Sequence, residues 1–98
     1  MSELETSEST RVVKNLMIKN ELGLHARAAS SLANLASKFQ SEIFIFKDGI
    51  EVNGKSIMGI LMLAAPKGSM IKVSAEGDDA DEAVKAIEDL VKRRFYEK

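Results

Sequence analysis

The sequence predicts an α+β fold, an open-faced βαββαβα sandwich in which a four-stranded antiparallel sheet carries its helices on one face. Two observations lead to this expectation. Stretches with alternating apolar residues, typical of strands, are interspersed with stretches whose apolar residues recur at helical spacing. The chain has 98 residues, of which 45% are hydrophobic and 30% charged, and this suffices for one core but not for two.

Residues 1–11 are expected to form a polar N-terminal tail in front of a folded domain over residues 12–98. The tail begins MSELETSEST and lacks the basic and apolar regions of a signal peptide. The chain has no cysteine, and no apolar run approaches the roughly 20 residues of a membrane-spanning helix. We therefore expect a cytoplasmic protein without membrane insertion.

The first elements of the domain are predicted to be a strand and a helix. Residues 12–19 alternate, with Leu16 and Ile18 on one face. Gly23 then gives the turn after this strand its backbone freedom. Residues 26–39 are rich in alanine, a strong helix former, and their apolar side chains recur at helical spacing. These apolar side chains are Ala29, Leu32, Ala33, Ala36 and Phe39.

The middle of the chain is predicted to form a hairpin and a short helix. β-Branched and aromatic residues make 42–47 a strand, and an Asp-Gly pair turns the chain into the partner strand 50–53. The apolar run 56–64 fits either a strand or a helix by its periodicity alone. We expect a helix, because Ser56 is a favoured N-cap and a Pro-Lys-Gly segment ends the run.

The last part of the chain is predicted to form a strand and a long helix. Residues 70–76 alternate in the manner of a half-buried strand. Residues 80–96 follow as a helix, and Asp79 with Glu82 provides a capping-box-like start. The apolar stripe of this helix consists of Ala83, Val84, Ile87, Leu90, Val91 and Phe95.

Composition excludes several classes of function. The absence of cysteine and the presence of a single histidine exclude thiol catalysis and a Cys/His zinc site, so we expect neither a metal nor a cofactor. The formal net charge is −1, and the aromatic residues are four phenylalanines and one tyrosine. These values argue against a nucleic-acid partner bound by phosphate neutralisation.

The single histidine, His25, stands where the first predicted helix begins. A helix start presents unpaired N–H groups and the positive end of the helix dipole, so it attracts anions such as phosphate. The same field favours a neutral, nucleophilic imidazole, and Arg27 is close enough in sequence to reach the same anion. His25 can therefore accept a phosphoryl group. By spacing alone, however, His25 can equally be a plain helix cap and Arg27 a surface charge.

Three separate motifs in the expected order make the chain similar to a known family. The motifs are Gly23-Leu24-His25-Ala26-Arg27, Val52-Asn53-Gly54-Lys55-Ser56-Ile57-Met58-Gly59 and Ser74-Ala75-Glu76-Gly77. Over residues 12–96 the sequence resembles HPr, the histidine-containing phosphocarrier family of the phosphoenolpyruvate-dependent sugar phosphotransferase system. The resemblance implies the HPr-like sandwich fold.

The resemblance also implies a stoichiometric phosphocarrier rather than an enzyme. In this reading Nδ1 of His25 takes a phosphoryl group from enzyme I and passes it to the A domain of an enzyme II, and Arg27 assists the transfer. The sequence departs from the family at Ala28, where the family usually has proline. Because a proline there would pre-set the backbone of the first helical turn, we expect its absence to change the transfer rate without abolishing function.

Two interpretations are open for Ser56. As a helix cap it is worth about 1 kcal/mol, which is reason enough for its presence. The resemblance adds that this serine is the target of HPr kinase/phosphorylase, and a phosphate here would repel acidic partners without unfolding the helix.

The resemblance further implies a docking surface beside His25. Its members are Ala26, Ser30, Asn34, Ile57, Met58 and Leu61. Ile60, Leu63 and Ala64, from the same apolar run as the last three, are expected to belong to the core instead.

The alternation of the strands is expected to point Leu16, Ile18, Ile43, Ile45, Ile71 and Val73 at the helices. Four apolar residues are then predicted on the outer face of the sheet: Met17, Phe44, Phe46 and Met70. We expect a monomer, but this face is apolar enough to contact the N-terminal tail or a second protomer.

Three alternative functions remain open at this point. The first is a regulatory HPr paralogue of a nitrogen or global-control branch that moves no sugar. The second is a small hydrolase of acyl phosphates, which would release free phosphate. The third is a ferredoxin-like regulatory domain, for which replacing His25 would leave the function intact.

Overall fold

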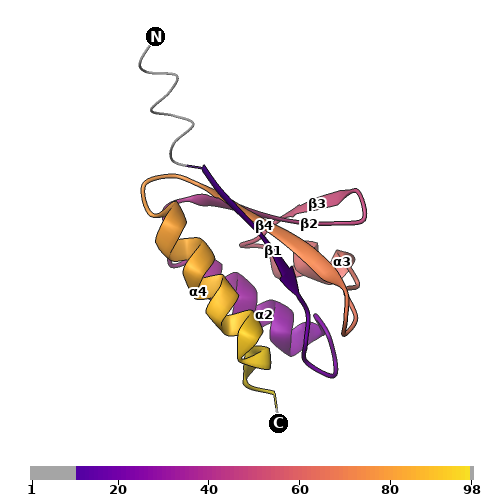
Figure 1. Cartoon of the computed structure of the whole chain (residues 1–98). Helices are drawn as coiled ribbons and strands as arrows, with labels where there is room; N and C mark the ends of the chain where they lie inside the picture. Colours follow the sequence, from indigo (N-terminus) through magenta and orange to yellow (C-terminus); the bar gives the residue numbers. More distant parts are fainter. Residues whose placement is uncertain (1–10, 98) are drawn as a thin grey trace.

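The structure is a computed structural model that describes residues 11–97, and it has the predicted order of elements. Four antiparallel strands form one sheet in the order β1-β4-β2-β3. The three α-helices of the described residues cover the same face of the sheet, and the other face is open (Figure 1). The elements are β1 (Arg11–Met17), α2 (Ala26–Ala36), β2 (Glu42–Lys47), β3 (Ile50–Asn53), α3 (Ile57–Met62), β4 (Met70–Glu76), α4 (Ala80–Lys92) and a 3-10 turn, η1 (Arg94–Tyr96).

The core lies between the sheet and the helices, as the strand alternation predicted. Six side chains predicted to point at the helices are at most 6% exposed. They are Leu16, Ile18, Ile43, Ile45, Ile71 and Val73. From the helices, Leu32 and Ile87 are fully buried against them. Apolar burial of this kind is the main term that stabilises the fold.

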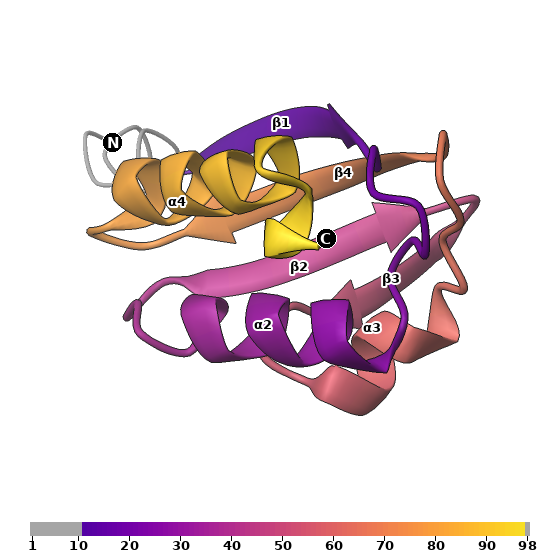
Figure 2. The ribbon, with the colours of Figure 1, turned by 90° about the horizontal axis from the view of Figure 1, so that it is seen from below.

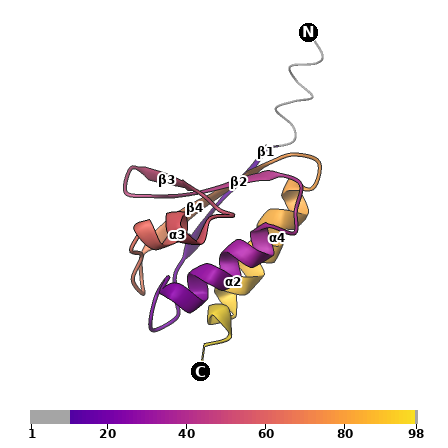
Figure 3. The same ribbon diagram turned by 180° about the vertical axis from the view of Figure 1, so that it is seen from behind.

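Several chain segments meet at one end of the molecule because of the way the helices pack. α2 lies between α3 and α4 and packs against both of them (Figure 3). α2 and α4 run in opposite directions, so the first turn of α2 and the last turn of α4 share one end (Figure 2). The loop from β1 into α2 reaches this same end (Figure 2).

The ends of the first predicted strand and of the first predicted helix were wrong by two and three residues. β1 ends at Met17 instead of residue 19, although Ile18 still exchanges backbone hydrogen bonds with the loop before β4. α2 ends at Ala36 instead of residue 39. There the hydroxyl of Ser37 donates to the carbonyl of Ala33 at 2.8 Å, a local bond that competes with further helix.

The predicted helix 80–96 is shorter than expected and ends in a left-handed turn. α4 stops at Lys92, and three consecutive residues then have positive φ: 55° at Arg94, 55° at Phe95 and 57° at Tyr96. Phe95 is nevertheless buried, at 8% exposure, so its apolar side chain joins the core from a reversed backbone. Hydrophobic spacing indicates which side chains are buried but not the sign of φ. The helix predicted from it was therefore longer than the observed α4.

The capping box predicted for α4 was also wrong. Asp79 is the N-cap residue, but its side chain makes no capping hydrogen bond. Its carboxylate instead accepts from the backbone N–H groups of Gln40 and Ser41, at 2.8 and 2.9 Å, and from the Ser41 hydroxyl at 2.5 Å. Asp79 thus ties the start of α4 to the connection between α2 and β2.

The short helix spans Ile57–Met62, with Ser56 as the N-cap, and it is two residues shorter than predicted at its end. Ile60 and Leu63 are buried as expected. Ala64 was assigned to the core wrongly, because it is exposed and its φ is 48°. The chain leaves the helix there and turns back toward β4.

Part of the predicted tail, residues 1–10, lies outside the described residues, whereas Arg11 is the first residue of β1. Between residues 11 and 97, no helix is both long and apolar enough to cross a membrane.

Candidate functional site

His25 is positioned by a tight loop that leads from β1 into α2. Gly23 has φ of 66°, and a Cβ atom there would lie 2.4 Å from the carbonyl oxygen of Ala65, so no other residue fits without a shift. The Leu24 N–H donates to the same carbonyl at 2.9 Å. The buried Asn20 side chain donates to the carbonyl of Gly23 at 2.8 Å. The backbone that carries His25 is therefore held from both sides.

His25 is the N-cap of α2, and its ring caps the helix through one nitrogen. Nδ1 accepts from the Arg27 N–H at 3.3 Å, while the His25 carbonyl accepts the first intrahelical bond from Ala29 at 2.8 Å. In this arrangement Nδ1 carries a lone pair that is aimed at the helix start. A group bonded to Nδ1 would lie in the field of the unpaired N–H groups, which favours an anion.

The other ring nitrogen of His25 faces Glu97, a residue that sequence reasoning missed. Nε2 lies 3.6 Å from the Glu97 carboxylate, whose side chain is only 14% exposed. The same carboxylate accepts from the N–H groups of Glu21 and Leu22, at 2.6 and 3.2 Å, and from Asn20 at 3.3 Å. Glu97 therefore links the end of the chain to the loop that holds His25.

The pKa of Glu97 is set by opposing effects. Burial raises the pKa of this carboxyl, but the hydrogen bonds from Asn20, Glu21 and Leu22 and the nearby His25 together lower it below its ordinary value. Glu97 is accordingly a carboxylate at neutral pH. Its negative charge faces Nε2, while Nδ1 faces the helix start.

No sequence signal identified Glu97. It is 72 positions after His25, and it reaches the ring only because the left-handed turn at residues 94–96 reverses the chain. The same is true of the hollow beside His25, which has a volume of about 610 Å³. The hollow is lined by Leu22, His25, Ala26, Arg27, Ala28, Phe95, Tyr96 and Glu97.

The structure places the other predicted residues of the His25 site at the start of α2. Arg27 is exposed and lines the hollow with His25. Ala28, where the related family usually has proline, is buried in the first helical turn.

Ser56 caps α3 as predicted. Its hydroxyl oxygen accepts from the Gly59 N–H at 3.0 Å, and its carbonyl accepts from Ile60 at 3.0 Å. The preceding Lys55 is fixed by its own bonds to the side chain of Asn53 and the carbonyl of Phe39, both at 2.8 Å. The serine is half-buried, and its hydroxyl stabilises the start of the helix.

The residues predicted for docking lie on two helices that pack against each other, α2 and α3. Met58 and Ile57 are 73% and 40% exposed, whereas Leu61 is half-buried against the core. On α2, Ala26 and Asn34 are exposed and Ser30 is half-buried. Met62 is 70% exposed and was missed, because a continuous apolar run does not reveal which members face outward.

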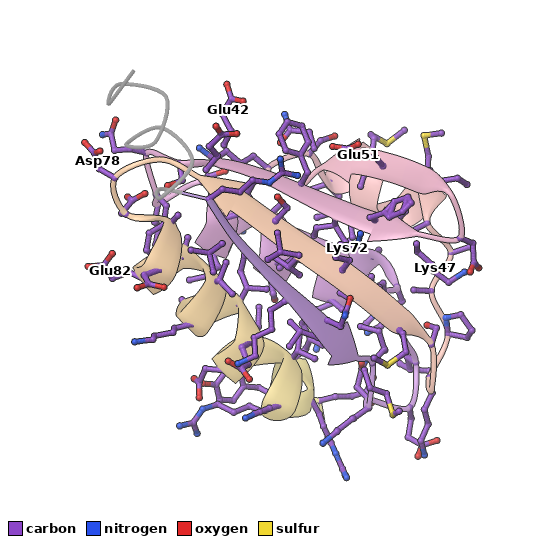
Figure 4. All side chains as sticks on the ribbon, turned by 45° about the horizontal axis from the view of Figure 1, so that its top comes forward. Glu42, Lys47, Glu51, Lys72, Asp78 and Glu82 are labelled. Carbon is purple, nitrogen blue, oxygen red and sulfur yellow. The ribbon has the colours of Figure 1, made fainter. Side chains whose placement is uncertain are left out.

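The open face of the sheet is less apolar than the sequence suggested. Met17 and Met70 are 47% and 52% exposed there, and Phe44 and Phe46 are half-buried. Charged side chains lie among them: Lys72 and Glu51 stand on this face (Figure 4), and the Lys72 ammonium lies 5.1 Å from the centre of the Phe46 ring. A shallow hollow of about 330 Å³ on this face is lined by Arg11, Phe44, Phe46, Glu51, Lys72, Ser74 and Glu76.

Within residues 11–97, no group of three or more His, Cys, Asp or Glu side chains is placed to hold a metal ion.

Comparison with known proteins gives one consistent result. Residues 12–93 match the family model described as the PTS HPr component phosphorylation site. The phosphocarrier protein HPr of Neisseria meningitidis serogroup A is 46% identical over 84 residues, which cover 86% of this chain and 94% of that protein. The phosphocarrier protein NPr of Shewanella violacea is 43% identical over 88 residues, which cover 90% and 97%.

The same relationship holds for solved structures. The crystal structure of HPr-C-His from Thermoanaerobacter tengcongensis superposes with a TM-score of 0.86 at 48% identity. The match covers 89% of this chain and 98% of that one.

Proposed function

Because this chain belongs to the HPr family of the phosphotransferase system, we propose that Nδ1 of His25 accepts a phosphoryl group from enzyme I, with phosphoenolpyruvate as the original donor. In the cytoplasm, the carrier then passes the group to the A domain of an enzyme II, which uses it for sugar uptake. The observation that supports this most directly is the position of Nδ1, which accepts the Arg27 N–H at the start of α2.

The transfer is a displacement at phosphorus. The Nδ1 lone pair forms the new N–P bond, the bond from phosphorus to the donor breaks, and the donor atom keeps that electron pair. The helix start and Arg27 are placed to stabilise the negative oxygens of the phosphoryl group. Positive charge that develops on the ring spreads to Nε2, where the Glu97 carboxylate lies 3.6 Å away.

The protein acts stoichiometrically in this scheme, and its partners supply the catalysis. Apart from His25, the ionisable groups lining the hollow are Arg27, Tyr96 and Glu97. Arg27 suits phosphate binding, and Glu97 is engaged by four groups of the chain. A hydrolase needs a group that positions water at phosphorus, which this set does not offer. Release of free phosphate without an acceptor protein would favour the hydrolase.

The first test is the intact mass of the protein after incubation with phosphoenolpyruvate and enzyme I. We expect a gain of about 80 Da that is lost in acid and survives base, as phosphohistidine requires. His25→Asn is the sharpest control, because asparagine still caps the helix but has no imidazole. We expect His25→Asn to fold with near wild-type stability and to gain no mass.

His25→Ala complements this control, since it removes the ring and the cap together. It is expected to lose about 1 kcal/mol of unfolding free energy as well as the mass gain. A His25→Asn protein that still gained the acid-labile 80 Da would contradict the assignment.

Ser56 serves as a second, regulatory site in this proposal, phosphorylated by HPr kinase/phosphorylase. Ser56 is half-buried at the start of α3, next to the exposed Ile57 and Met58. A phosphate there adds about −1.5 to −2 charges beside the docking surface formed by Ala26, Ser30, Asn34, Ile57, Met58 and Leu61. Acidic partners would then bind this surface less well.

Ser56→Asp and Ser56→Asn form a matched pair that separates charge from capping. Both side chains cap helices, but only aspartate is charged. We expect Ser56→Asp to slow phosphorylation of His25 by enzyme I, and Ser56→Asn to leave the rate close to wild type. Equal rates for the two variants would exclude repulsion as the regulatory mechanism.

A second candidate is a paralogue that serves a regulatory branch without sugar transport. The 43% identity to the NPr of Shewanella violacea supports this alternative. Comparing phosphorylation rates with the enzyme I proteins of the two branches, taken from one organism, distinguishes them. A clear preference for the sugar-branch enzyme I would exclude the paralogue.

A further inference from the structure

The hollow beside His25 has an exposed apolar rim that phosphorylation chemistry alone does not require. Leu22, in the loop before α2, and Tyr96, in the turn after α4, are each 66% exposed and line this hollow. Ala26, Ala28 and Phe95 add further apolar lining. An exposed apolar rim of this kind, next to a reactive group, is typical of a contact surface.

The rim is a separate feature from the docking surface on α2 and α3. α2 separates α3 from α4, and the C-terminal turn lies on the α4 side (Figure 3). Ile57 and Met58 belong to α3, on one side of α2, while Leu22 and Tyr96 line the hollow together with the turn after α4.

Hydrogen bonds donated by backbone N–H groups fix the positions of Leu22 and Tyr96, the two members of the rim, relative to each other. The Leu22 N–H donates to Glu97, the residue directly after Tyr96, at 3.2 Å. The neighbouring Glu21 N–H donates to the same carboxylate at 2.6 Å. Tyr96 is also held by its backbone, whose N–H donates to the carbonyl of Arg93 at 3.0 Å. A rim that is ordered before binding loses little entropy when a partner covers it.

Geometry requires a phosphoryl donor to approach this rim. The donor must bring its phosphorus into contact with Nδ1 of His25, and His25 itself lines the hollow. Atoms around the phosphorus therefore come next to the hollow, where the exposed side chains are the apolar Leu22, Ala26 and Tyr96 beside the charged Arg27. Apolar groups of the donor gain by covering them, whereas polar groups lose hydration.

We propose that Leu22 and Tyr96 form a specificity rim that receives an apolar side chain of enzyme I during phosphoryl transfer. This inference rests on the proposed function. It adds a second contact on the α4 side of His25 and predicts that this contact contributes to recognition of the donor rather than to chemistry.

The test uses the full-length protein and the double variant Leu22→Ala with Tyr96→Gly. Glycine suits the φ of 57° at residue 96, so the turn retains its backbone conformation. Met70→Ala is the matched control, because Met70 is 52% exposed on the open sheet face, outside the hollow. Phosphorylation by enzyme I is measured over a range of carrier concentrations, which separates KM from kcat.

We expect the double variant to raise KM by about fivefold to tenfold with little change in kcat, as loss of two apolar interface contacts predicts. Met70→Ala is expected to keep the wild-type KM. The rate at which isolated phosphohistidine hydrolyses should also be unchanged in the double variant, because His25, Arg27 and Glu97 are retained.

Two outcomes overturn the inference in distinguishable ways. If wild type and double variant are phosphorylated with the same KM, the rim takes no part in recognition, and the proposed function still stands. If the wild-type protein itself gains no phosphoryl group from any enzyme I, the proposed function fails and the inference fails with it. A drop in kcat together with faster phosphohistidine hydrolysis would assign the rim to chemistry instead.

Discussion

At the scale of single residues, the two nitrogens of His25 have opposite surroundings. Nδ1 accepts an N–H at the positive end of α2, and Nε2 faces a carboxylate. The first environment suits an incoming anion, and the second suits positive charge left on the ring. Polarising an imidazole from both sides in this way requires only the backbone of α2 and one glutamate.

Glu97→Gln tests the carboxylate directly. We expect kcat for phosphorylation of His25 to fall on the order of tenfold, because the ring loses the charge that stabilises Nε2. KM should change little, since Gln keeps the size of the side chain. Rates are measured by mass spectrometry of quenched reactions. Glu88→Gln is the control, because Glu88 pairs with Lys14 and Lys92; equal rates for both variants would contradict this role of Glu97.

Ala28→Pro tests the departure from the related family. The first intrahelical bond of α2 comes from the Ala29 N–H, so the Ala28 N–H lies in the first turn and has no intrahelical acceptor to lose. Proline also restricts the unfolded chain. We expect the unfolding free energy to rise by roughly 0.5 kcal/mol. Urea denaturation measures it, and a marked loss of stability would show that the ring does not fit among the buried neighbours.

At the scale of elements, several chain reversals use non-glycine residues with positive φ. Ala64 ends the segment after α3 at φ of 48°, and residues 94–96 form the left-handed turn after α4. Such a conformation costs roughly 1–2 kcal/mol for a residue with a Cβ atom. The second turn places Glu97 beside His25, so local strain lies at the end of the molecule that carries His25.

Ala64→Gly removes this cost at the position where little else changes. Ala64 is exposed, so the substitution takes no side chain from the core. Since the strain exceeds the entropy that glycine adds to the unfolded chain, we expect the unfolding free energy to rise by about 0.5 kcal/mol. Thermal and urea unfolding measure the effect. Ala86→Gly, at a half-buried position inside α4, should lower stability; a loss for both variants would refute the assignment of strain to residue 64.

At the scale of the whole molecule, hydrogen bonds to two carboxylates connect distant segments at opposite ends of the helical layer. Asp79 connects the start of α4 to residues 40 and 41, and Glu97 connects the end of the chain to the loop before α2. Hydrogen bonds from the Ser41 hydroxyl and from the N–H groups of Gln40 and Ser41 outweigh burial and lower the pKa of Asp79. Both connections depend on an ionised carboxylate.

Asp79→Asn tests this connection through pH. The pKa of Asp79 is lower in the folded protein than its ordinary value of 3.8, so its contribution to stability is fully present above that pH and is lost as the pH falls further. We expect Asp79→Asn to be less stable than wild type at pH 7 and the difference to shrink below about pH 4. Urea denaturation across this range measures it. Asp81→Asn, exposed in the first turn of α4, serves as control; a difference that stayed constant with pH would contradict the prediction.

Much of this molecule is determined by the sequence alone. Alternation in the strands, helical spacing and the Asp-Gly turn gave the order of elements and the inward-facing residues, because these patterns are local consequences of side-chain direction and burial. Three short motifs gave the family, together with His25, Arg27 and Ser56 as candidates. The cap at Ser56 was likewise local, since it needs only the four residues of one helical turn.

Tertiary structure alone decided the surroundings of His25. Glu97, Leu22 and Tyr96 meet there because α4 runs antiparallel to α2 and a left-handed turn reverses the chain. The carboxylate of Asp79 likewise accepts from Ser41 instead of capping its own helix. Such contacts join residues about 40 to 75 positions apart. Local sequence patterns describe which side chains are buried, but the packing of whole elements determines which of them meet.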